Sequence, residues 1–252
     1  MATSPVGKIL VHLLGGFQVW CGEHEVVLPP TSQHLLARVA LVGRVPRSAL
    51  AGELWPDLPE GRAQANLRTS IWQVRRLCPD LLVHAGEVVA LPATAEVDLH
   101  LTQALALSVI RDVAAVPTDS LMSHLHALEL LPGWYEEWVL AERERDRQLR
   151  LHALELTAHA LLSRGLAGAA MHAALAAVQL EPLRESAHRA VITIHLSEGN
   201  VAEALDQYGL YRSVMLAEVG IEPTRSLQEL LGVAARGAPI PSQRSQRALR
   251  GG

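Results

Sequence analysis

The chain has 252 residues and a formal net charge of −4; 49% of its residues are hydrophobic and only 4% are aromatic. This length fits one large domain or two ordinary ones, and the apolar content is sufficient for a real core. The abundance of Ala and Leu favours helices over sheets. No stretch looks able to span a bilayer and no secretory signal pattern is present, so we expect a cytoplasmic protein without a membrane partner.

Charge and cysteine usage narrow the function classes. Residues 1–99 have a net charge of −1 and residues 100–235 a net charge of −7, whereas residues 236–252 hold four Arg and no acid. A nucleic-acid function must therefore rest on local clustering of charge rather than on the overall balance. The two cysteines, Cys21 and Cys78, do not form a disulfide framework by their spacing, and we expect two reduced thiols.

The first part of the chain predicts a sheet, three helices and a hairpin. The expected strands are 8–20 and 24–29; the expected helices run from a cap at Thr31-Ser32 to Gly43, over 47–55 with Ser48 as a possible cap, and over 62–77; the expected hairpin is 81–91. This order is typical of a winged helix-turn-helix with an additional N-terminal sheet.

The second part reads as helical after a linker at Pro92. An extended piece passes into a helix over 96–110, and a long helix over 135–165 carries charges of alternating sign, which we interpret as a solvated face. A repeat with an offset of 34 residues aligns 160–175 with 194–209 and indicates tetratricopeptide-like helical repeats. Residues 237–252 are rich in Pro, Ser and Arg, and we expect them to be disordered.

The predicted third helix concentrates positive charge. Residues 62–77 include four Arg and no Asp or Glu. A helical wheel puts Ala63, Leu67, Ser70, Ile71, Val74 and Cys78 on a core-facing stripe. Because carboxylates would be repelled by phosphates on both sides of a DNA groove, we interpret the opposite face as DNA-binding. The candidate DNA-binding residues are Arg62, Asn66, Arg68, Thr69, Trp72, Gln73, Arg75 and Arg76. The alternative for Trp72 is packing against the sheet or the wing.

Segments in both halves resemble a known family. Residues 13–19 and 55–77 resemble the OmpR-like winged helix of the streptomycete antibiotic regulatory proteins, which are transcriptional activators. Residues 96–100, 131–150 and 220–231 resemble the bacterial transcriptional activator domain of the same family. The expected domains are a DNA-binding domain (1–95), an activator domain of helical repeats (96–235) and a basic tail (236–252).

The resemblance implies a function. Such proteins bind direct repeats of double-stranded DNA near the −35 element of a promoter, and the resemblance implies a homodimer on DNA, association with the nucleoid and control of specialised-metabolite genes. It also implies recruitment of RNA polymerase holoenzyme, with the sigma factor and the alpha subunit as contacts. The Gly7-Lys8 pair lacks the P-loop pattern, because Ala2 and Ile9 occupy its Gly and Ser/Thr positions, so we expect no ATPase module here.

Two alternatives come from other classes. An enzyme would need a site, but the segment beginning at His24 has Leu28 where a zinc protease has its second His, and it reads as a strand. We therefore expect no catalytic residues, no cofactor and no metal. The other alternative is a helical-repeat scaffold for protein partners with a degenerate winged helix, which the low net charge of residues 1–99 supports.

Overall fold

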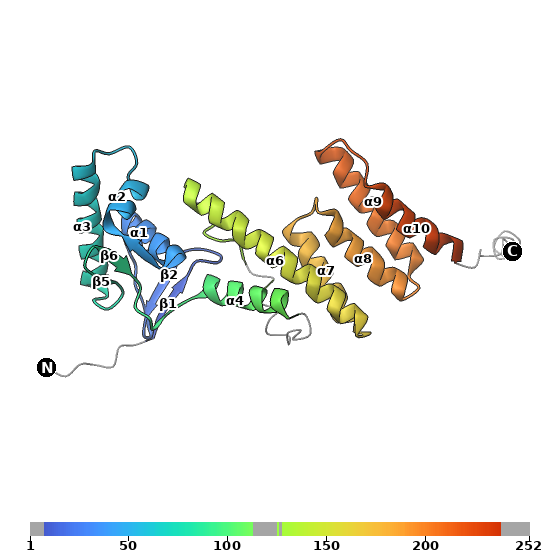
Figure 1. Ribbon diagram of the computed structural model, residues 1–252, viewed down its shortest axis with the longest axis horizontal. Coiled ribbons are helices and arrows are strands. Elements are labelled where there is room, and N and C mark those ends of the chain that lie inside the picture. Colours follow the sequence, from blue (N-terminus) through green and yellow to red (C-terminus); the bar gives the residue numbers. More distant parts are fainter. Residues whose placement is uncertain (1–7, 113–124, 126–127, 238–252) are drawn as a thin grey trace, which may run out of the picture. The chain divides into compact units, whose positions relative to one another are not determined.

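The computed structural model describes residues 8–112, 125 and 128–237 (Figure 1). The chain forms two compact units: the first comprises residues 1–107 and 123–149, and the second comprises residues 108–122 and 150–252. The expected fold class, mainly helical with a small β component near the N-terminus, is confirmed. Residues 236 and 237, expected at the start of the disordered tail, instead end the last helix, and the rest of that prediction, from residue 238 onward, lies outside the described part.

A four-stranded sheet opens the first unit, in the order β3-β2-β1-β7. Its strands are β1 (Ile9–His12), β2 (Gln18–Cys21), β3 (His24–Glu25) and β7 (Ala95–Val97). β1 pairs antiparallel with β2 and parallel with β7, so that Val11 lies opposite both Val19 and Val97. The strand expected over 24–29 is confirmed only for its first two residues. Pro29 and Pro30 lack the N–H that a strand ladder needs, and Pro30 already begins the next helix.

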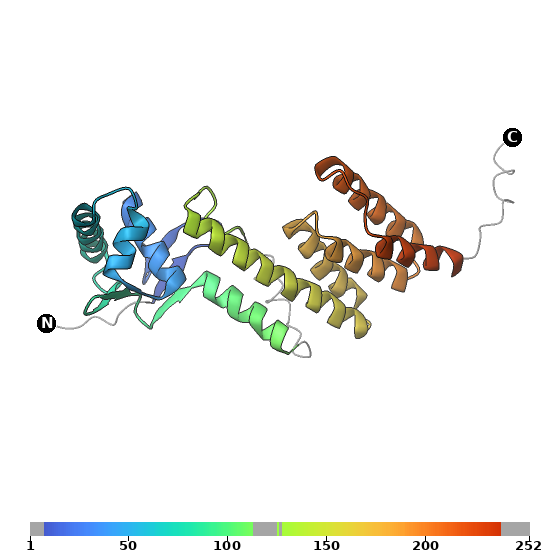
Figure 2. The same cartoon turned by 45° about the horizontal axis from the view of Figure 1, so that its top comes forward.

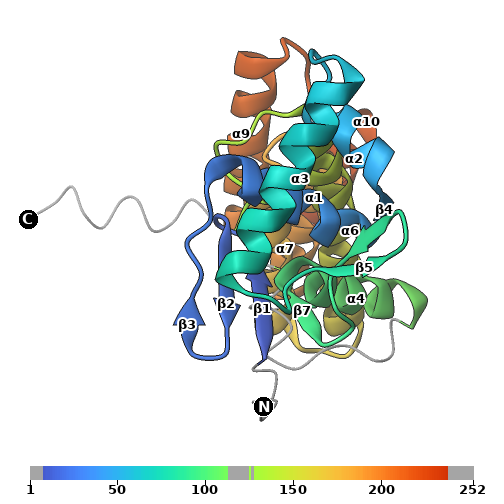
Figure 3. The ribbon, with the colours of Figure 1, turned by 90° about the vertical axis from the view of Figure 1, so that its left-hand side faces the viewer.

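The winged helix follows in the predicted order (Figure 3). Its elements are α1 (Pro30–Val42), β4 (Arg44–Pro46), α2 (Arg47–Leu54), α3 (Glu60–Leu77), β5 (Val83–Ala85) and β6 (Val88–Ala90). Strands β4, β6 and β5 form a second sheet in that order, and the β5–β6 hairpin is the wing. Gly43 ends α1 as expected, with a positive φ of 88° that favours glycine. Strand β4 was not predicted, because three residues are too few to show alternation.

All three helices begin earlier than expected, α1 and α2 before their expected capping residues and α3 before residue 62. Thr31-Ser32 and Ser48 do not cap α1 and α2; the residues before α1, α2 and α3 are Pro29, Pro46 and Pro59, each in an extended conformation. Proline fixes φ near the value that all three show, so the chain enters each helix directly after it. As a consequence, α3 includes one carboxylate, Glu60, in its first turn, where negative charge suits the helix dipole.

A disulfide joins the N-terminal sheet to the end of α3. Cys21 ends β2 and Cys78 is the C-cap of α3, and their Cα atoms are 6.9 Å apart. The expectation of two reduced thiols is therefore wrong for this structure. The two cysteines are separated by 57 positions in the sequence, and nothing in that spacing indicated that the end of β2 and the end of α3 meet in the fold.

The remaining helices are α4 (Asp98–Arg111), α6 (Glu137–Ser163), α7 (Ala167–Leu180), α8 (Glu185–Ser197), α9 (Val201–Glu218) and α10 (Arg225–Gly237). In the second unit α7 packs on α8 and α8 on α9, which Figure 2 shows from a second direction. Asp98 links the first helix of this series to the N-terminal sheet: its carboxylate accepts the backbone N–H groups of Leu13 and Leu14 at 2.9 and 3.1 Å.

The predicted 34-residue repeat is confirmed in detail. Gly165 after α6 and Gly199 after α8 both have a positive φ, of 76° and 77°. The Ser163 and Ser197 hydroxyls donate to backbone carbonyls three residues earlier, at 2.8 and 2.7 Å. Each turn is followed by a fully buried alanine, Ala170 or Ala204, at the aligned position. Small residues at these positions allow close approach of the packed helices.

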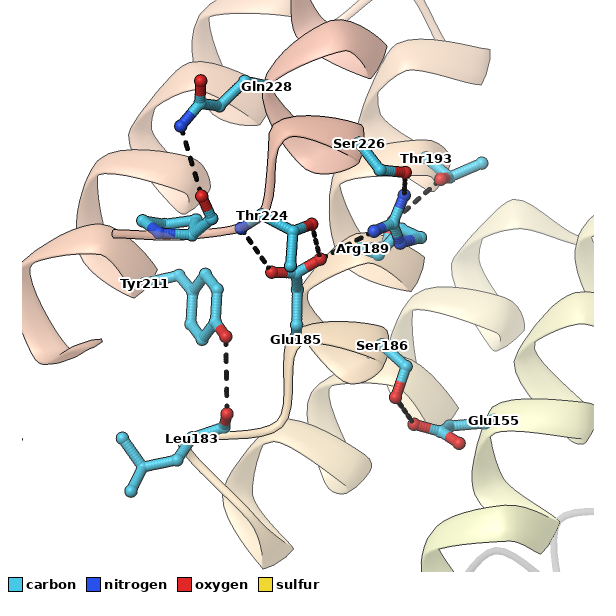
Figure 4. Close-up of polar contacts among 11 residues, drawn as sticks. Glu155, Leu183, Glu185, Ser186, Arg189, Thr193, Tyr211, Thr224, Ser226 and Gln228 are labelled. Carbon is cyan, nitrogen blue, oxygen red and sulfur yellow. Dashed lines mark hydrogen bonds and ion pairs between the residues drawn. The ribbon is translucent and has the colours of Figure 1, made fainter. Parts of the chain in front are cut away.

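Polar contacts tie α8 to the start of α10 (Figure 4). Glu185 accepts the backbone N–H of Thr224 at 2.8 Å and also the Thr224 hydroxyl, and it pairs with Arg189 at 2.7 Å. Arg189 in turn donates to Ser226 at 3.0 Å. Burial raises the pKa of Glu185, but the donors from Thr224 and Arg189 outweigh burial, and the pKa lies below its usual value.

Helix α6 uses its charged residues in two ways. Glu142–Arg145 and Glu144–Arg147 form ion pairs on its surface, as the alternating charges of this segment suggest. Asp146 and Arg150, expected on the same solvated face, are instead buried, with exposed fractions of 0% and 2%. The sequence showed the alternation of charge but not the side from which the neighbouring segments cover the helix.

Two features that would change the function class do not occur in the part of the chain that the structure describes. None of its helices is both long and apolar enough to cross a membrane. No three of its His, Cys, Asp and Glu side chains gather closely enough to hold a metal ion. His24 lies on β3, so the segment that begins there starts as a strand, although only its first two residues belong to it.

Candidate nucleic-acid interface

Helix α3 has the orientation that the helical wheel predicted. The side chains of Ala63, Leu67, Ser70, Ile71 and Val74 are buried, and Cys78 after the helix is buried as well. They face a core that α1 and α2 supply with Leu35, Leu36 and Leu50, all fully buried. Because this side of α3 is buried, the opposite side must face outward.

The outer face holds nearly all of the candidate residues. The exposed ones are Arg62, Asn66, Arg68, Thr69, Trp72, Arg75 and Arg76, and Gln73 is half-buried. Within the described residues, no carboxylate lies within 4.0 Å of the Arg62, Arg68, Arg75 or Arg76 guanidinium. Apart from Glu60 in its first turn, α3 presents no negative charge of its own. Its outer face is thus free to bind an anion.

A groove runs between α3 and the wing. It has a volume of about 690 Å³ and is lined by Arg47, Arg68, Ile71, Trp72, Arg75, Arg76 and Gly86. Four of these seven residues are arginines and none is acidic. Arg47 comes from the start of α2, and its backbone N–H donates to Glu87 O in the wing at 2.8 Å. A phosphate at this groove would meet guanidinium groups from two helices.

Trp72 is exposed rather than covered by the sheet or the wing. Its exposed fraction is 58%, and the Arg76 guanidinium lies over its ring, 5.3 Å from the centroid. This cation–π contact holds both side chains on the outer face. The indole plane can contact a thymine methyl group while the neighbouring guanidinium groups contact phosphate.

Two candidate residues also have partners inside the protein. The Thr69 hydroxyl donates to Ala65 O at 3.1 Å, and its oxygen remains an acceptor. Gln73 Oε1 accepts the Ser32 hydroxyl at 2.8 Å, which fixes the amide against α1. Gln73 is therefore oriented by the core side of the helix, whereas Arg68 and Thr69 face outward.

The sequence reasoning missed Arg47 and Gly86. Both lie outside α3 in the chain and join the groove only because β4 and the wing bring them there. A usable signal was present: Gly86 has a positive φ of 63° at the hairpin turn, as the Ala85-Gly86 turn suggested. Once the wing is expected beside α3, Arg47, the basic residue that begins α2, becomes a candidate for the same groove.

Comparisons with known proteins agree with this fold. The family model of the bacterial transcriptional activator domain matches residues 92–232. The Regulatory protein AfsR of Streptomyces coelicolor is 31% identical over 242 residues, covering 89% of this chain and 24% of that protein. AfsR of Streptomyces griseus is 28% identical over 233 residues, covering 86% and 24%. The chain thus spans about a quarter of the length of these relatives.

A solved structure supports the fold as well. EmbR of Mycobacterium tuberculosis, in complex with a low-affinity phosphopeptide, matches with a TM-score of 0.73 and 21% identity over 96% of this chain and 68% of that one. A winged helix followed by tetratricopeptide-like helices, with a basic outer face on α3, is an architecture that suits a regulator of transcription. The chain belongs to the streptomycete antibiotic regulatory protein family, and its residues 92–232 form a bacterial transcriptional activator domain.

Proposed function

We propose that this activator binds direct repeats of double-stranded DNA near a promoter −35 element and recruits RNA polymerase holoenzyme. The observation that carries the proposal is the groove between α3 and the wing, which is lined by four arginines and no acid. B-DNA admits a helix to its major groove, and phosphates flank that helix on both sides. A helix face with exposed arginines that have no carboxylate partner within the described residues suits this environment.

The proposed contacts divide by their place along the helix. Arg68, Thr69 and Asn66 lie near the middle of the outer face, where side chains reach base edges, and Trp72 adds an apolar contact. Arg75 and Arg76 in the last turn and Arg62 in the first turn contact phosphates. Gln73 contributes through its free amide nitrogen. The proposed DNA-binding domain is residues 1–95.

The helical part supplies the second half of the proposal. Residues 100–235 have a net charge of −7, which disfavours contact with DNA and favours a basic protein surface. We assign residues 96–235 to contact with the sigma factor and the alpha subunit, and to holding two copies on adjacent repeats, which adds avidity. The basic tail from residue 236 adds non-specific attraction to DNA. The protein acts by binding alone, without catalysis, at the nucleoid, and its targets are genes of specialised metabolism.

The test is selection of genomic fragments by the full chain, followed by footprinting. We expect enrichment of paired direct repeats in promoters, and stimulation of open-complex formation by purified polymerase on those promoters. The variant with Arg68, Arg75 and Arg76 all replaced by Ala should enrich no sequence, while the variant with Arg145 and Arg147 replaced by Ala should behave like the wild type. If the wild type enriches no sequence at physiological salt, the scaffold alternative replaces this proposal.

A further inference from the structure

A second cleft of the first unit lies away from α3. It has a volume of about 830 Å³ and is lined by Thr31, His34, Arg38, Glu53, Leu54, Trp55, Pro56, Glu136, Glu137, Trp138 and Ala141. The lining comes from α1, from the end of α2 and from the first turns of α6. This volume lies within the range of about 300–1,000 Å³ that is usual for small-molecule sites. Two tryptophans and three carboxylates in one cleft are an unusual lining that the DNA-binding function does not require.

One side of the cleft already shows how it accommodates a cation. The Arg38 guanidinium lies 5.6 Å from the centroid of the Trp138 ring, and its Nε is 2.6 Å from a carboxylate oxygen of Glu53. A guanidinium between an indole face and a carboxylate is the arrangement by which proteins bind organic cations. Here the chain itself provides the cation, which contacts one oxygen of Glu53.

The other side of the cleft has the same kinds of group without a cation. Glu136 Oε1 lies 2.5 Å from His34 Nε2, but Glu136 Oε2 is buried and has no hydrogen-bond donor. Glu137, in the first turn of α6, is exposed, and within the described residues no partner of its carboxylate is found. Trp55, half-buried at the end of α2, lines this cleft too. A buried carboxylate oxygen without a donor is costly, and rotation of the Glu136 carboxylate, whose side chain is 35% exposed and lines the cleft, would let a bound donor satisfy it.

We propose that this cleft binds a small organic cation with a guanidinium or alkylammonium head, held by Glu136, Glu137 and the indole rings of Trp55 and Trp138. The charge balance supports a cation over an anion, because three carboxylates face one arginine and one histidine. The site lies against α1 of the winged helix and against α6, which belongs to the matched activator domain. A cation bound here would connect these two helices within the first unit.

The probe for the test is n-butylguanidinium, compared with the uncharged isostere n-butylurea at constant ionic strength. NMR spectra of the full chain would follow the indole N–H signals of its five tryptophans, assigned by Trp→Phe variants. We expect the Trp55 and Trp138 signals to shift saturably with n-butylguanidinium, with a Kd on the order of 1 mM, as suits so small a ligand. The Trp20 and Trp72 signals should stay in place, and n-butylurea should shift none.

The variants decide whether the carboxylates bind the cation. The double variant Glu136→Gln with Glu137→Gln should bind n-butylguanidinium at least about tenfold more weakly, because charge-assisted hydrogen bonds are lost. Glu144→Gln, on the same helix but outside the cleft, should bind like the wild type. If the double variant fails to fold, Glu137→Gln alone carries the test, because no internal contact of that carboxylate is lost.

Two further results bear on the proposal. Equal shifts with n-butylurea, or unchanged binding by the variants, would overturn it. A blocked tripeptide, acetyl-Gly-Arg-Gly-amide, distinguishes the source of the cation. If it binds more tightly than n-butylguanidinium with the same dependence on Glu136 and Glu137, the cation is a side chain of a basic partner; if it binds more weakly, the cation is a free small molecule.

Discussion

Helices α3 and α6 are both rich in arginine, but they use it in opposite ways. In α3, Arg68, Arg75 and Arg76 are exposed, and the described residues place no carboxylate in ion-pair range of them. In α6, Arg145 and Arg147 each pair with a glutamate three residues earlier. The number of arginines on a helix therefore says little about anion binding. The absence of carboxylate partners among the described residues is the informative feature, and it explains how a segment with a net charge of −1 can carry a cationic face.

The largest effect is expected on stability, from replacement of an arginine of α6 that donates to backbone carbonyls inside the first unit. Arg143 donates to Leu130 O at 2.9 Å, to Leu131 O at 2.7 Å and to Trp134 O at 3.0 Å, and its side chain is only 18% exposed. Arg143→Met should lower the free energy of unfolding by about 3 kcal/mol, because several acceptors lose a charged donor. Urea titration measures this value.

The matched control for this change is Arg145→Met on the same helix. Arg145 is 73% exposed, and it pairs only with Glu142. Its replacement should cost between 0 and about 1 kcal/mol, as for other surface pairs. Equal losses for the two variants would mean that the carbonyl contacts of Arg143 do not stabilise the first unit.

A smaller effect is expected for a substitution in the middle of α3, and it concerns DNA sequence discrimination rather than stability. Arg68→Ala should leave stability unchanged, because the side chain is exposed, but it should lose discrimination at particular base pairs by about 1–3 kcal/mol. Binding-site selection with the variant measures this loss. Recovery of the wild-type motif from Arg68→Ala would show that Arg68 does not read bases.

Replacement of an arginine at the end of α3 should weaken binding to all DNA sequences alike. Arg75 lies in the last turn and lines the groove beside the wing. Arg75→Ala should weaken every sequence by a similar factor and reduce the slope of log K against log[salt] by about 0.9, the value for one phosphate contact. Arg145→Ala should leave the slope as it is. A slope that the Arg75 variant does not change would exclude contact with phosphate.

Much of the fold was predictable because its signals are local. The inner stripe of α3 follows from a 3.6-residue period, and every residue assigned to it is buried. The repeat turns at Gly165 and Gly199 follow from internal similarity and a required positive φ. The prediction of an exposed α3 face with Arg68 and Trp72 followed directly, since fixing one side of a helix fixes the other.

The remainder depended on contacts between distant segments. Cys21 meets Cys78, and Arg47 joins the groove of α3, only after the sheet and the wing have formed. Asp146 resembles its charged neighbours in the sequence, yet it is buried. Which side of α6 is covered depends on neighbouring segments that the charge pattern does not identify. The predicted first residues of the helices were wrong for a more local reason. The proline before each helix determines where it begins, whereas the Ser and Thr side chains expected as caps do not.

The smallest expected effect is a difference in pH dependence between α3 and the second unit. Arginines stay charged from pH 5 to 8, so the cationic face of α3 does not titrate in this range. In the second unit, His188 is buried, stacks on Tyr211 with ring centroids 4.4 Å apart, and contacts Pro182 O through Nε2 at 2.9 Å. Gln207 Nε2 lies 2.8 Å from His188 Nδ1, so that the neutral ring with its proton on Nε2 satisfies both contacts.

Burial lowers the pKa of His188 below its usual value. The unfolded chain, with an ordinary histidine pKa of about 6.5, therefore takes up a proton before the folded one does. The contribution to stability is complete above about pH 6.5 and is lost as the pH falls from there through the folded pKa. Amide exchange of α8 and α9 should accelerate between pH 7.5 and 5.5, after correction for the intrinsic rate, more than that of α3. In His188→Phe, which keeps the ring contact but cannot titrate, the overall protection should be lower and this extra pH dependence should disappear. If the variant keeps the full dependence, another group of the second unit takes up the proton.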